Sequence, residues 1–161
     1  MDDFVYFGTA RALHVVGVVL WIGGVAFVTT TLIPSLRAMP NADQRLTLFE
    51  KLEGKFAFQA RIVTLITGLT GFYMLEFMNA WDRYQQAQFW WIHLMTLIWF
   101  IFTVVLFVLE PLFLHRRFRM LAIENSEKAF KILHNMHKLL LALSLLTVFV
   151  SVAGAHGLFF V

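Results

Sequence analysis

The chain has 161 residues, of which 60% are hydrophobic, 16% aromatic and 14% charged, with a formal net charge of +3. This balance excludes an ordinary soluble domain, in which about 25% of residues are charged. Cysteine is absent, which excludes disulfides, thiolate metal sites and thiol nucleophiles. The composition predicts an integral membrane protein in which residues 1–161 form one transmembrane domain in contact with the lipid bilayer, with no nucleic-acid partner.

Four apolar runs are long enough to cross a bilayer, which takes roughly 20 helical residues. They cover about residues 12–34, 56–78, 89–113 and 138–161. The chain start lacks the basic region and cleavage site of a signal peptide, so we expect the first run to be retained. Because short connections make successive helices antiparallel neighbours, the predicted fold is all-α: an integral membrane four-helix up-and-down bundle.

Two prolines and two amphipathic segments refine these limits. Proline lacks an N–H donor, so we expect the first helix to end near Pro34 and the third to end or kink near Pro111. The segments QRLTLFEKLEGKF and RMLAIENSEKAFKILHNM predict short amphipathic helices on the cytoplasmic surface. The second of these could continue into the fourth membrane helix.

The basic residues predict the orientation in the membrane. Eleven of the thirteen Lys and Arg residues lie in or beside the connections 34–56 and 113–138, whereas only Arg11 and Arg83 lie on the side of the membrane that holds the termini. The positive-inside rule therefore assigns those two connections to the cytoplasm and both termini to the outer side.

Histidines and one glutamate collect near the outer ends of the four runs. His14, His93 and His156 belong to the first, third and fourth runs, and Glu76 to the second. An ionisable group in a membrane helix is costly, and imidazole is a common metal ligand and an axial ligand of haem. The shared depth predicts a haem or metal site containing His14 and His93, with His156 and Glu76 as further candidates. The alternative is that each is a hydrogen-bonded residue at a helix end.

Three further histidines lie at the cytoplasmic ends of the helices. His115, His134 and His137 have basic neighbours, which favours a solvated role or contact with lipid headgroups. No nearby carboxylate in the sequence completes a metal site with His134 and His137. A second haem held by His115 and His137 is the alternative.

Three segments resemble the HemJ and CopD families of small polytopic bacterial inner-membrane proteins. RALHVVGVVLWIGGVAFVTTTLIPSL is similar to their opening helix through its Leu-His pair and its Trp-Ile-Gly-Gly sequence. ARIVTLITGLTGFYML and WWIHLM resemble the second helix and the start of the third. HemJ-like proteins are associated with b-type haem and protoporphyrinogen IX oxidation, and CopD-like proteins with copper. The resemblance implies a bacterial inner-membrane location, with both termini periplasmic, and His14 and His93 as ligands.

One residue departs from the HemJ pattern and keeps the alternatives open. Met95 stands where HemJ proteins usually carry a lysine, which weakens the porphyrinogen-oxidising interpretation and favours copper slightly. The leading hypothesis is a haem b protein with a redox or electron-transfer role and a quinone or a redox protein as its partner. If the protein is an enzyme, this hypothesis makes it an oxidoreductase. A copper-binding or copper-transport protein using His14, His93 and His156 is the alternative, and a structural subunit is the third interpretation.

Overall fold

The computed structural model describes residues 2–158, and this part of the chain forms helices and no strand. Four helical rods are each long and apolar enough to cross a membrane. The predicted all-α four-helix membrane bundle is therefore confirmed. The last residues of the fourth predicted run, 159–161, lie outside the described part.

The rods are longer than the apolar runs. Their elements are α1 (Asp2–Phe27), the π-helical turn η1 (Val28–Leu32) and α2 (Ile33–Arg37); α3 (Ala42–Phe77); α4 (Trp90–Val104), the π-helix η4 (Val105–Leu114) and α5 (His115–Glu124); and α6 (Ser126–Ala155). The short helices η2 (Trp81–Gln85) and η3 (Ala87–Phe89) lie between α3 and α4.

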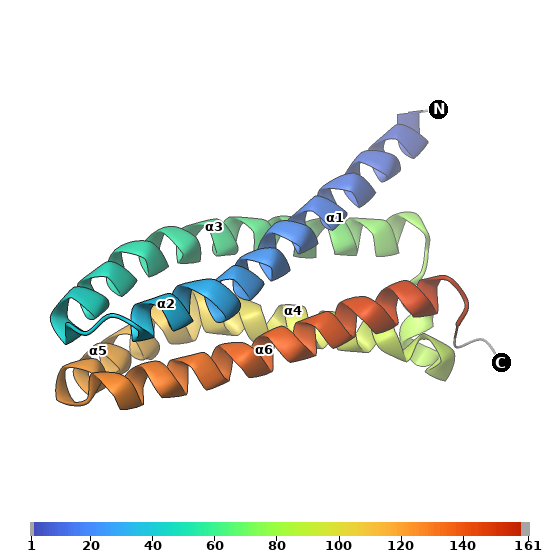
Figure 1. The fold of residues 1–161 in the computed structure, drawn as a ribbon. Coiled ribbons are helices and arrows are strands. Elements are labelled where there is room, and N and C mark those ends of the chain that lie inside the picture. Colours follow the sequence, from blue (N-terminus) through green and yellow to red (C-terminus); the bar gives the residue numbers. More distant parts are fainter. Residues whose placement is uncertain (1, 159–161) are drawn as a thin grey trace.

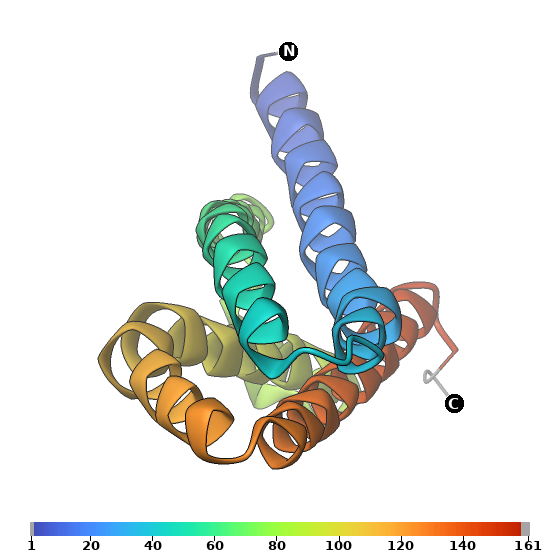
Figure 2. The ribbon, with the colours of Figure 1, turned by 60° about the vertical axis from the view of Figure 1, so that its left-hand side comes forward.

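Successive rods run in opposite directions, so the start of α1 and the end of α6 lie at the same end of the bundle as η2 and η3 (Figure 1). We call this the terminal end. The opposite end holds the turns between α2 and α3 and between α5 and α6, and we call it the basic end after its Lys and Arg residues. Figure 2 shows that the first half of α1 leans away from α4 and α6.

The two expected amphipathic segments differ from the prediction in their boundaries. Residues 44–56 form the first part of α3, because nothing interrupts the helix after Asn41, whose side chain accepts a hydrogen bond from the Gln44 N–H at 2.9 Å. Residues 119–136 are divided between α5 and α6 at Asn125, which caps α6 by accepting from the Lys128 N–H at 2.9 Å. An N-cap at each turn thus sets where the long rods begin.

Pro34 does not end the first rod, which continues to Arg37. The reason is the π-helical turn before it, where the Ile33 N–H bonds to the Val28 carbonyl, five residues back. In that pattern Pro34 would bond to the Thr29 carbonyl, but proline has no N–H to donate. His134 of α6 supplies the missing donor, with Nε2 at 2.9 Å from the Thr29 oxygen.

Pro111 lies within η4 and likewise neither ends the third rod nor leaves its backbone unsatisfied. The same five-residue pattern holds here, with the His115 N–H bonded to the Glu110 carbonyl. It leaves the Leu106 carbonyl without a backbone donor, since Pro111 lacks one. Arg61 of α3 supplies it, with Nε at 2.9 Å from the Leu106 oxygen.

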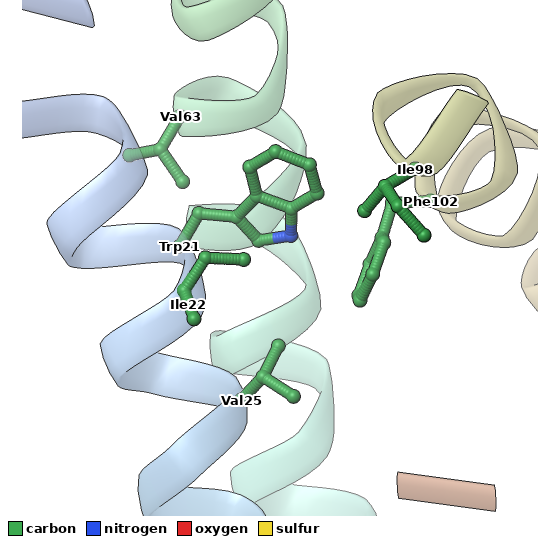
Figure 3. Packing of buried hydrophobic residues seen from close by; sticks show 6 residues of the cluster. All are labelled: Trp21, Ile22, Val25, Val63, Ile98 and Phe102. Atoms are coloured by element: carbon green, nitrogen blue, oxygen red, sulfur yellow. The ribbon is translucent and has the colours of Figure 1, made fainter. Parts of the chain in front are cut away.

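Buried side chains from three rods fill the middle of the bundle. The cluster contains Trp21, Ile22, Val25, Val63, Ile98 and Phe102 (Figure 3). Trp21 meets Phe102 edge-on with ring centroids 4.9 Å apart, which is a favourable aromatic geometry. On the outside of the rods, large apolar side chains such as Leu69 and Phe149 are exposed, as expected for surfaces that face lipid.

Candidate functional site

His14 joins α1 to α3. Its Nδ1 lies 2.9 Å from the Thr67 carbonyl and 3.2 Å from the Thr70 hydroxyl. A carbonyl can only accept, so Nδ1 carries the proton and Nε2 carries the lone pair. A methyl group added at Gly71 would come within 3.2 Å of the imidazole Cε1, so the glycine makes room for the ring.

His93 lies at the start of α4 and is held by the connection before it. Its Nε2 lies 2.9 Å from the Tyr84 carbonyl, and the Tyr84 ring meets the imidazole edge-on at 5.0 Å. The remaining nitrogen, Nδ1, is therefore unprotonated in the neutral ring. The side chain lines an open aromatic depression together with Phe72 and Trp99. His93 is thus fixed in orientation while its ring remains accessible.

His156 and Glu76 make local contacts. His156 follows α6 and its Nδ1 lies 2.8 Å from the Val152 carbonyl of the same helix. Glu76 accepts a hydrogen bond from the Trp81 indole at 2.7 Å. Both residues are exposed. Neither contact excludes a ligand role, and neither contact joins these residues to His14 or His93.

The four residues predicted at the terminal end do not form a compact ligand set. Over residues 2–158, only one group of three or more His or carboxylate side chains has ligand atoms all within 4.8 Å of one another, and it contains none of these four. His14 packs on the Thr67–Gly71 face of α3, whereas Phe72 of the same helix lies beside His93. The site at this end therefore remains a prediction.

The compact group lies at the basic end and consists of Glu53, Glu110 and His115, from α3, η4 and α5. Glu53 Oε2 is 3.6 Å from His115 Nδ1, and Glu110 forms an ion pair with Arg61. Glu53 and Glu110 are about four-fifths buried, whereas the His115 side chain is 44% exposed. The group thus begins at the surface and reaches into the bundle.

Sequence reasoning missed both carboxylates of this group. The signal that could have found Glu110 is its position directly before Pro111 in the third apolar run, where an ionisable residue is costly without a partner. Arg61 is likewise an ionisable residue near the start of the second apolar run, where it also needs a partner. Pairing the two required knowing how α3 and η4 face each other.

The other two histidines at this end have different surroundings. His134 is buried and bonds to the Thr29 carbonyl, and its Nδ1 has no hydrogen-bond partner among the described residues. This is a structural position rather than the solvated one expected. His137 Nδ1 lies 3.0 Å from the Leu133 carbonyl, and its ring lines a cavity that His115 also lines.

The cavity has a volume of about 280 Å³ and extends from the Glu53 group into the apolar middle of the bundle. Its walls come from all four rods and are mostly aliphatic and aromatic, with polar side chains only toward the basic end apart from Trp21. Pockets for small ligands typically have volumes of about 300–1,000 Å³, and this cavity lies just below that range.

Comparisons with known proteins found no matching family model, no matching curated protein and no matching solved structure.

Proposed function

We propose that this protein is a membrane-embedded haem b protein with a redox or electron-transfer role, in which His14 and His93 hold the haem near the terminal end. The observation that carries the proposal is the hydrogen bonding of the His14 ring. Its Nδ1–H is anchored on the Thr67 carbonyl, and Nε2 has no hydrogen-bond partner among the described residues. Ligating histidines are commonly oriented in this way, by a hydrogen bond from the nitrogen that does not bind the metal.

His93 supports the proposal by the same logic. The Tyr84 carbonyl holds Nε2, which leaves Nδ1 with its lone pair beside an aromatic depression. Either ring nitrogen of histidine can serve as a metal ligand. Once bound, haem would supply one-electron chemistry, and the apolar aromatic surroundings would help to set its potential.

The location proposed for this function is a bacterial inner membrane with both termini on the periplasmic side. The concentration of Lys and Arg residues at the basic end supports this orientation through the positive-inside rule. The haem would then lie near the periplasmic face. A quinone or a redox protein would act as its electron partner.

Copper binding or transport is the second candidate, and the observation that favours it concerns all three terminal-end histidines. His14, His93 and His156 each bond to a backbone carbonyl through one nitrogen and keep the other without a hydrogen-bond partner in the described structure. Three such imidazoles would suit a copper site, with Glu76 or Met95 as a further ligand.

The visible absorption spectrum of the purified protein, measured with its total metal content, tests these candidates. We expect a Soret band and sharp reduced α and β bands, and we expect His14→Ala and His93→Ala each to lose them while remaining folded. Stoichiometric copper without a Soret band would contradict the haem proposal. Neither haem nor copper, even after supplementation of the expression host, would contradict both and leave a structural role.

His156→Ala is the discriminating control variant. His156 is exposed and bonds only to its own helix, so the substitution should leave the fold and a His14–His93 haem unchanged. Loss of copper in this variant would favour the three-histidine site. His137→Ala, at the basic end, controls for a haem bound there instead.

A further inference from the structure

Two carboxylates, those of Glu53 and Glu110, lie close together at the basic end although both side chains are about four-fifths buried. They belong to different rods, and with His115 of α5 they bring three ligand atoms within 4.8 Å of one another. Like charges disfavour each other strongly where little water separates them. The group therefore needs positive charge to balance its two carboxylates.

The protein supplies one permanent positive charge to this group. Arg61 forms an ion pair with Glu110, and among residues 2–158 no other Lys or Arg forms one with either carboxylate. The remaining partner, His115, is positive only when its ring is protonated. With a neutral imidazole, one negative charge is left without a counter-ion, and a bound cation would balance it.

The separation of Glu53 and His115 fits two ligands of one metal ion better than a direct contact. Glu53 Oε2 and His115 Nδ1 are 3.6 Å apart, which is too long for a hydrogen bond between them. Oxygen and nitrogen ligands lie about 2.1 Å from an ion such as Zn²⁺, so two of them at an angle of about 90–120° are about 3.0–3.6 Å apart. The observed distance agrees with that range.

Glu110 is oriented by an outer partner, as metal-binding carboxylates usually are. Arg61 donates through Nε to the Leu106 carbonyl at 2.9 Å and pairs with Glu110 through a second nitrogen. A carboxylate has two oxygens and about four acceptor positions, so the pair with Arg61 leaves positions free for a metal ion. Arg61 thus fixes Glu110 without occupying it completely.

An ion has a path to the group from the basic end, where α5 and the first half of α3 lie (Figure 1). The His115 side chain is 44% exposed, and all three residues of the group line the cavity. Three protein ligands beside an open space leave coordination positions for water, as in metal sites that the protein does not close. Access and free coordination positions are both requirements of an exchangeable metal site.

We propose that Glu53, Glu110 and His115 bind one divalent transition-metal ion, with Arg61 as the residue that positions Glu110. Two carboxylates and one imidazole are a suitable ligand set for Mn²⁺, Fe²⁺ or Zn²⁺. Because the ligands come from α3, η4 and α5, the bound ion would hold two rods together at the basic end. The site is independent of the haem proposed at the terminal end.

Titration of the detergent-solubilised full chain with Mn²⁺ tests the proposal, with free Mn²⁺ followed by its electron paramagnetic resonance signal. We expect one ion to bind per chain even in excess Mg²⁺, because Mg²⁺ prefers all-oxygen ligands. Glu53→Gln and His115→Ala should each weaken Mn²⁺ binding at least about tenfold, since loss of even an outer-shell partner typically costs about 10–100-fold in metal affinity.

Glu50→Gln is the matched control, because Glu50 lies on the same helix and pairs with Arg119 at 3.5 Å, outside the group. It removes the same charge as Glu53→Gln, and its Mn²⁺ affinity should equal that of the wild type. His14→Ala should also bind Mn²⁺ like the wild type, which separates this site from the histidines at the terminal end.

Four results would each overturn the proposal. The wild type binds no stoichiometric Mn²⁺, or excess Mg²⁺ displaces the bound ion. Glu53→Gln or His115→Ala, shown by circular dichroism to be folded, keeps wild-type affinity. Glu50→Gln weakens binding as much as Glu53→Gln, which would indicate general attraction to negative charge, or His14→Ala does so, which would place the ion at the other end.

Discussion

The two proline-containing π-segments face the same backbone problem and solve it differently. Each leaves one carbonyl without its donor, Thr29 before Pro34 and Leu106 before Pro111, and each borrows a donor from another helix. The first donor is a buried imidazole, His134, and the second is the guanidinium of Arg61.

The choice of donor decides what else the segment must contain. An imidazole can donate this bond without carrying a charge, so the first segment does not require a counter-ion. Arginine is always charged, so the second segment needs a counter-ion, which Glu110 provides. Glu110 in turn approaches Glu53 and His115 at the mouth of the cavity. We infer that one segment only locks two rods together, whereas the other also creates a polar site.

Arg61→Leu should give the largest loss of stability, because it breaks the second segment and its counter-ion together. The Leu106 carbonyl loses its donor and the Glu110 carboxylate is left unpaired. We expect a loss of about 2–4 kcal/mol, since removing one partner of a buried pair strands the other charge. Unfolding of the purified protein in detergent, followed by circular dichroism, measures it.

The double variant Arg61→Leu with Glu110→Gln is the control for the charge. It removes the stranded carboxylate as well, so it should recover more than half of the stability lost by Arg61→Leu alone. If both variants are equally unstable, the ion pair does not explain the arginine.

His134→Leu should have an intermediate effect, because only a neutral hydrogen bond is lost. The Thr29 carbonyl becomes unsatisfied in a buried position, which costs about 1–3 kcal/mol. Pro34→Ala restores a backbone N–H for this carbonyl, so His134→Leu should cost less in that background than in the wild type. An equal cost in the two backgrounds would show that His134 stabilises the bundle in some other way.

Glu53→Gln should have the smallest effect on stability. The side chain of its partner His115 is 44% exposed, and His115 Nδ1 lies 3.6 Å from Glu53 Oε2. The pair therefore resembles a surface ion pair, which contributes at most about 1 kcal/mol to stability. His115→Ala should match it in the same unfolding measurement. A loss above about 2 kcal/mol in either variant would indicate that this pair belongs to the buried network of Arg61 and Glu110.

Much of the architecture follows from hydrophobic runs and charges alone. The four apolar runs predicted the four rods, although the helices extend past Pro34 and begin earlier than the run at 56. Proline was expected to stop a helix, and it does not do so here because a π-turn and a borrowed donor remove the penalty. The candidate site was less predictable, because the depth of His14 and His93 followed from their positions along the apolar runs but their hydrogen bonds did not.

The sequence by itself determined how deep each residue lies along the membrane normal, because this depth depends only on its position along a helix. The count of residues along a helix, with about 1.5 Å of rise for each, assigns His14, His93 and His156 to one end and the basic residues to the other. Rotation of the helices about their axes and their crossings were decided only by the tertiary structure. The rotations and crossings bring Arg61 to the Leu106 carbonyl, bring two carboxylates to His115 and place Trp21 at the edge of a cavity. Such contacts join residues that no local sequence pattern relates.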